Sequence, residues 1–229
     1  MFDAIALPAS RILNVLQHQV GWFACVLGAA WGHPLLGCMV ALAAHTTHVF
    51  ATVQPMKELK LMFTVALLGT VLDSIHRSLG VLSFASSMGP SWLAPLWISM
   101  LWLGFATTLA HSLAWLRDRY ALAALLGFIG GPLSFFAGYR LNAVAFPQGL
   151  PYSLFVIACV WALVMPCLIA LAKAMVANDP PVPYRFFSPR LGIFSLDTQS
   201  VAMAQASLAT KEKTHSWIAY TSDSQDVSQ

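Results

Sequence analysis

The chain has 229 residues, of which 58% are hydrophobic and only 9% are charged, and its mean hydropathy is +0.70. A soluble domain averages about 25% charged residues, so this composition excludes a water-soluble fold, and a net charge of +3 that is small and scattered argues against nucleic-acid binding. The composition predicts an all-α, polytopic membrane helix bundle, because only a lipid-facing surface can be this apolar.

Six apolar segments follow one another along the chain, each near the ~20 residues that a helix needs to cross hydrocarbon. They are long continuous runs without the alternation of a membrane β-barrel, so helices are expected. Pro- and Gly-containing breaks or charged residues separate them. The predicted spans are Asn14–Gly32, Pro34–Val53, Leu59–Leu82, Trp92–Leu116, Tyr120–Tyr139 and Tyr152–Met175.

Basic residues gather at alternate ends of these spans, and only Arg140 lies at the opposite ends. Lys and Arg near span ends mark the cytoplasmic side. The pattern therefore predicts a multi-pass protein with both the N- and the C-terminal side in the cytoplasm. The cations that carry this prediction are Arg11, Lys57, Lys60, Arg117, Arg119 and Lys173.

Composition changes at Asn178, where the proline-rich run Asp179–Pro183 cannot continue a helix. Residues 1–177 are therefore predicted to form a six-helix transmembrane domain. Residues 178–229 are polar and predicted to form a cytoplasmic tail that is largely disordered, with a docking tail as the alternative.

The third predicted span holds three ionisable residues, Asp73, His76 and Arg77. Their spacing of three and four residues puts them on one helical face. A charge at mid-bilayer costs about 2.5–3.5 kcal/mol on insertion scales, so Asp73 is expected to pair with Arg77. The pair has two interpretations, a structural ion pair and a titrating functional site.

Three further histidines lie in predicted spans, His45 and His48 in the second and His111 in the fourth. His45 is expected near the depth of Asp73, and His48 and His111 about one turn nearer the cytoplasm. Hydrogen bonding between helices is one interpretation of all three. A His-x-x-His pair can ligate a metal, but no larger ligand cluster accompanies it, so neither a metal nor another cofactor is predicted.

The fifth span carries small residues at spacings of three and four, which form a smooth stripe on which another helix can pack closely. Within the stripe, a proline removes a backbone donor at mid-span, so either a packing helix with a kink or a cavity-lining break is expected. The residues of interest are Gly127, Gly130, Gly131, Pro132 and Gly138.

Aromatic residues near the span ends are expected to form interface belts at the two membrane surfaces. They are Trp92, Trp97, Trp115, Tyr120, Tyr139 and Tyr152. No chemistry is assigned to them.

Several stretches are similar to a known family: residues 90–97 (PSWLAPLW), 105–109, 127–138 (GFIGGPLSFFAG) and 71–74, together with Asn14 and Trp22-Phe23. They resemble a bacterial inner-membrane family described only as a domain of unknown function, over about Asn14–Ala174. The resemblance implies a small multi-span protein of the bacterial inner membrane. It also implies a lipid-related role, through gene groups that include cyclopropane-fatty-acid-synthase-like methyltransferases, but it carries over no catalytic residue. His45, His48, His76 and Arg77 do not match the family's pattern.

Three functions remain open at this stage. The first is an accessory or binding protein in membrane-lipid modification, whose partners are membrane lipids and a lipid-modifying enzyme or other membrane protein. The second is a small proton-coupled transporter in which Asp73 titrates. The third is a membrane-embedded lipid enzyme that uses Asp73 and His45 for acid–base chemistry, although no convincing nucleophile–base set is present.

Overall fold

A computed structural model describes residues 2–87 and 89–176 of the chain, and the predicted tail at 178–229 lies outside the described residues. Six α-helices account for most of this region, which confirms the predicted all-α bundle. They are α1 (Phe2–Ala30), α2 (Pro34–Ala51), α3 (Pro55–Ser78), α4 (Leu96–Ala110), α5 (Tyr120–Arg140) and α6 (Leu150–Val176). A 3₁₀ turn, η1 (Ala114–Leu116), follows α4.

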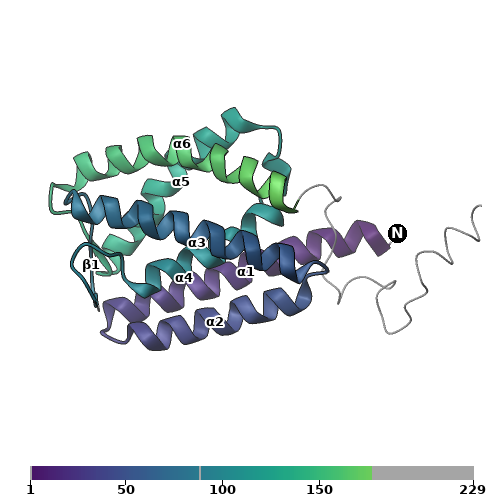
Figure 1. Cartoon of the computed structure of the whole chain (residues 1–229), viewed down its shortest axis with the longest axis horizontal. Helices are drawn as coiled ribbons and strands as arrows, with labels where there is room; N and C mark the ends of the chain where they lie inside the picture. The colour runs from purple at the N-terminus through teal and green to yellow at the C-terminus, as the bar shows by residue number, and fades with distance from the viewer. Residues whose placement is uncertain (1, 88, 177–229) are drawn as a thin grey trace, which may run out of the picture. The chain divides into compact units, whose positions relative to one another are not determined.

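Helices adjacent in sequence pack as hairpins, α1 on α2, α3 on α4 and α5 on α6 (Figure 1). Proline at the first turn starts α2 and α3, where a missing N–H costs nothing. Gly32 turns the chain between α1 and α2 with φ +80, a conformation that favours glycine. Gly37 lets these two helices touch, since a Cβ there would lie 2.3 Å from the carbonyl oxygen of Ala24.

Two short strands join the loops at one end of the bundle. β1 (Ser83–Phe84) pairs antiparallel with β2 (Val144–Ala145), so the α3–α4 and α5–α6 connections are held together. The third predicted span ends earlier than expected, at Ser78, because Gly80 adopts a left-handed φ of +70 and the chain turns into β1.

The fourth predicted span, Trp92–Leu116, is too long. α4 is a 15-residue helix that ends at Ala110, with non-helical backbone before it and the η1 turn after it. At 1.5 Å per residue it covers roughly 22 Å of the ~30 Å of hydrocarbon. A helix of this length can still lie within the membrane because α4 contacts α1, α2, α3 and α6. Irregular backbone at membrane depth is tolerated where other parts of the protein bury it.

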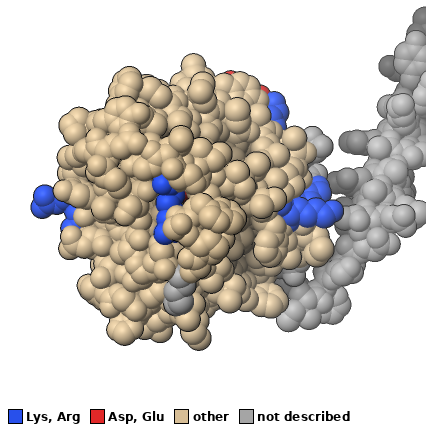
Figure 2. Space-filling view, turned by 60° about the vertical axis from the view of Figure 1, so that its left-hand side comes forward, with Lys and Arg blue, Asp and Glu red and all other residues tan. Residues whose placement is uncertain are grey.

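The other five helices are each long and apolar enough to cross a membrane. Their outward faces carry large exposed apolar side chains such as Met39, Phe50, Phe63 and Leu163. Figure 2 shows one face of the protein as an almost uncharged surface with a few isolated Lys and Arg side chains. A surface of this kind is favourable in contact with lipid acyl chains and unfavourable in contact with water. The chain is therefore a membrane protein with transmembrane helices.

Candidate functional site

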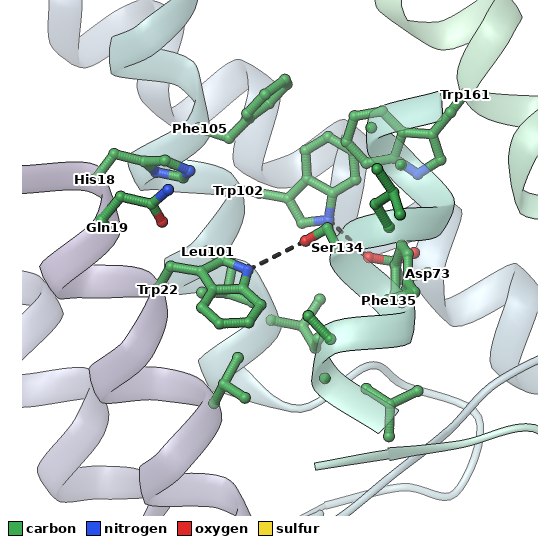
Figure 3. A pocket seen from close by; sticks show the side chains of 18 of the residues that line it. His18, Gln19, Trp22, Asp73, Leu101, Trp102, Phe105, Ser134, Phe135 and Trp161 are labelled. Carbon is green, nitrogen blue, oxygen red and sulfur yellow. Dashed lines mark hydrogen bonds between the residues drawn. The ribbon is translucent and has the colours of Figure 1, made fainter. Parts of the chain in front are cut away.

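A cavity of about 610 Å³ lies among α1, α3, α4, α5 and α6 (Figure 3). It exists because α5 packs chiefly on α6, whereas α1 packs on α2 and α4, so the two groups of helices diverge between α1 and α5. Phe23 and Leu133, which line it, are 50% and 59% exposed, so the cavity is open to the surroundings of the bundle and not sealed.

Aromatic rings form the inner wall of the cavity. Trp102 of α4 stacks on Trp161 of α6 with centroids 5.1 Å apart and planes 10° apart. Phe105 meets the same two rings edge-on, at 5.9 Å from Trp102 and 5.5 Å from Trp161. These interlocked rings are rigid, so the wall keeps a fixed shape.

A hydrogen bond links α1 to α5 across the cavity, where Trp22 Nε1 donates to Ser134 Oγ at 3.2 Å (Figure 3). His18 and Gln19, one turn earlier on α1, add polar groups to the lining. Bonds of this kind between transmembrane helices are worth about 0.6 kcal/mol on average, so this one can open at little cost.

Asp73 is the one carboxylate that lines the cavity among the residues described, and its side chain is 1% exposed. One oxygen accepts a 2.8 Å hydrogen bond from Trp102 Nε1, and the other lies 3.3 Å from His76 Nδ1. The expected Asp73–Arg77 pair is wrong, because the Arg77 guanidinium donates to the carbonyl oxygen of Leu93 instead. The spacing of four residues would have allowed an Asp73–Arg77 ion pair. Instead, the indole N–H of Trp102 on α4 donates to one oxygen of the Asp73 carboxylate.

The histidines of α2 and α4 do not line the cavity. His45 Nε2 hydrogen-bonds the carbonyl oxygen of Met100, 3.0 Å away, and so joins α2 to α4. His48 and His111 lie together, with ring centroids 5.0 Å apart, and both face the carboxylate of Glu58. The predicted polar residues therefore fall into two places, Asp73 with His76 by the cavity and His48 with His111 by Glu58.

The small residues of α5 divide between packing and lining. A Cβ at Gly127 would meet the Trp161 carbonyl oxygen at 2.3 Å, and one at Gly131 would meet the Trp161 ring at 2.3 Å. Gly130 has no atom within 4 Å of its Cβ position and lines the cavity, and Gly138 packs beside Val144. The helix continues through Pro132 from Tyr120 to Arg140 without a break.

Several residues that belong to the cavity or to the cluster around Glu58 could not be recognised from the sequence. Glu58 lies in a polar stretch that reads as a loop, but Pro55 starts α3 and buries Glu58 in the first turn. Trp102 and Trp161 stand in apolar runs with nothing to mark them as cavity residues. The belt interpretation is wrong for Trp97, which is 1% exposed and whose Nε1 donates to the carbonyl oxygen of Ala85.

Comparison with protein families finds one match, over residues 11–167, to a family described as a protein of unknown function, DUF2878. The match confirms the resemblance to a family of that kind and covers both the cavity and the Glu58 cluster. No curated protein and no solved structure matches the chain.

Proposed function

Since the chain belongs to the DUF2878 family, whose function is unknown, we propose from its geometry that it binds one acyl chain of a membrane lipid. In this proposal the protein is an accessory component of membrane-lipid modification in the bacterial inner membrane. The observation that carries it is the cavity between α1, α4 and α5, walled by aromatic rings and open beside a lipid-facing surface.

The size and lining of the cavity suit an acyl chain. Its 610 Å³ falls within the roughly 300–1,000 Å³ of ligand pockets. Most of the lining is aliphatic or aromatic, and Gly130 leaves open space along α5. A chain that leaves the bilayer gains little from the hydrophobic effect, so contact with the fixed Trp102, Trp161 and Phe105 rings has to provide the affinity.

A binding protein of this kind is useful to an enzyme that modifies acyl chains. Chains inside a bilayer are covered by their neighbours and are out of reach of an active site in water. A cavity that holds one chain apart from the bulk lipid fixes its position, and positioning is a large part of catalytic advantage. The resemblance of residues 90–97 and 127–138 to a family associated with fatty-acid-modifying methyltransferases supports the same role.

A phospholipid with a photoreactive group on one acyl chain tests the proposal in vesicles that contain the purified protein. Bulk lipid can label the exposed surface, but it cannot reach Trp102, which is 4% exposed. We expect peptide mapping to find label on α4 at Trp102 and Phe105. Label confined to outward-facing residues such as Phe63 and Leu163 would refute binding in the cavity.

A second candidate, proton-coupled transport, is favoured by one observation, the buried Asp73 carboxylate in the cavity wall. Intramembrane carboxylates commonly serve proton relays. Asp73→Asn keeps an acceptor for Trp102 and removes the titrating group. Transport predicts that proton flux in proteoliposomes disappears in this variant, whereas lipid binding predicts that photolabelling of Trp102 persists.

A further inference from the structure

We propose that His48, Glu58 and His111 form a binding site for a divalent transition-metal ion, zinc above all. The three residues come from three elements: His48 from the last turn of α2, Glu58 from the first turn of α3, and His111 from the residue that caps α4. One ligand atom of each lies within 4.8 Å of the others. The site is separate from the acyl-chain cavity and independent of the proposed function.

The geometry of the three ligand atoms is close to that of a coordination sphere. His111 Nε2 lies 2.8 Å from Glu58 Oε1, and His48 Nε2 lies 3.4 Å from Glu58 Oε2. Two ligands bound about 2.0–2.2 Å from one zinc ion at a tetrahedral angle lie roughly 3.4 Å apart. Both nitrogen–oxygen separations are therefore close to those of a zinc site, and small side-chain shifts suffice to admit an ion between the two Nε2 atoms and the carboxylate.

The donor set is one that zinc uses. Two imidazole nitrogens and one carboxylate oxygen form a His₂Glu site, which leaves a fourth position for water or another ligand. The two rings stand at 89° to each other with both Nε2 atoms toward the same carboxylate, so neither ring blocks the other. Glu58 and His48 are 2% and 1% exposed, and His111 is the most accessible of the three ligands, with its side chain 12% exposed.

Two of the three helix ends at the site favour a cation. His48 and His111 lie at the C-terminal ends of α2 and α4, which carry partial negative charge, whereas Glu58 lies at the partially positive N-terminal end of α3 and contributes its own carboxylate. Arg117 also interacts electrostatically with Glu58. Its positive charge adds to that of a bound ion, so the fourth ligand position favours an anion over a neutral group.

This site replaces the metal ligands that sequence spacing suggests. His45 and His48 form the His-x-x-His pair, but His45 is committed to the carbonyl oxygen of Met100. The partners of His48 come from 10 and 63 positions further along the chain, where helix packing rather than local spacing brings them together. The prediction that the chain has no metal site rested on the His-x-x-His pair and on the lack of a larger ligand cluster in the sequence, and neither shows which residues helix packing brings together.

Calorimetric titration of the purified full chain in detergent with Zn²⁺, after treatment with a chelator, tests the site. We expect one ion per chain, and a visible d–d spectrum typical of tetrahedral coordination when Co²⁺ is used. Glu58→Gln and His111→Ala should each weaken Zn²⁺ binding by at least about 100-fold, since even groups behind the ligands are worth about 10–100-fold. His45→Asn is the matched control, a buried histidine of the same helix as His48, and should bind Zn²⁺ as the wild type does.

A second measurement guards against variants that fail to fold. Bound Zn²⁺ at 100 times its Kd should stabilise the wild type by about 2.7 kcal/mol, seen as a higher Tm. The Tm of Glu58→Gln, whose amide keeps one hydrogen bond to a histidine, should not respond to Zn²⁺. The absence of Zn²⁺ binding by the folded wild type, or equal binding by Glu58→Gln, would reduce the three residues to a hydrogen-bonded cluster and overturn the proposal.

Discussion

Alanine substitution at three glycines of α5 gives a graded test of how this helix defines the cavity. Each substitution gains about 0.5–1 kcal/mol, because alanine loses less backbone entropy in a helix than glycine does. Gly130 faces open space, so Gly130→Ala should keep that gain. At Gly131 the new methyl group overlaps the Trp161 ring and at Gly127 the Trp161 backbone. Such overpacking costs about 1–3 kcal/mol.

The entropy gain is the same at adjacent positions and cancels, so Gly131→Ala should be about 1–3 kcal/mol less stable than Gly130→Ala. Gly127→Ala should lie at the upper end of that range, because the new methyl group overlaps the backbone of α6 and not only a side chain, so relief requires the whole helix to shift. A difference of 1 kcal/mol corresponds to roughly 2–4 °C in Tm for a chain of this size. Thermal unfolding in detergent measures the order Gly130→Ala, Gly131→Ala, Gly127→Ala from high to low Tm. Equal Tm values for the three variants would refute the packing of α5 on Trp161.

The remaining predictions concern Trp102, the topology and the membrane. Trp102→Phe removes the hydrogen bond to Asp73 and should lower the free energy of unfolding by about 1–3 kcal/mol, the cost of leaving a buried acceptor without its partner; a Tm equal to that of the wild type would contradict it. A membrane-impermeant thiol reagent should label Asp118→Cys only from the cytoplasmic side and Asn142→Cys only from the opposite side, and the reverse would invert the predicted topology. Deletion of the gene should change the fatty-acid profile of the membrane under stress, and an unchanged profile would count against lipid modification.

The number and the approximate limits of the helices follow from the sequence, because hydrocarbon-length apolar runs and their Pro/Gly breaks are local features. The length of α4 does not, since the flanking segments 92–95 and 111–116 are mostly apolar but are not α-helical, and each is anchored by buried residues, Ala94 and Pro95 before the helix and Ala114 and Leu116 after it. Local hydropathy carries no information about which protein surface will cover a segment.

The two candidate sites were predictable only in part. Asp73, His48 and His111 stand out in the sequence, because ionisable residues inside spans are costly. Their partners do not: Trp102 lies in a purely apolar run, and Glu58 lies in a stretch that looks like a loop. Which side chains meet depends on the rotation of each helix about its axis, and a bundle whose helices are apolar on nearly every face gives little periodicity from which to read that rotation.

Native mass spectrometry of the protein released from detergent tests most directly whether the cavity holds a lipid chain. Gly130→Trp should fill the cavity, whereas Ile129→Trp, its neighbour on α5, places the same ring on the exposed surface outside it. We predict one retained lipid on the wild type and on Ile129→Trp, and none on Gly130→Trp. Equal lipid retention by the two tryptophan variants, or no retained lipid on the wild type, would contradict the account.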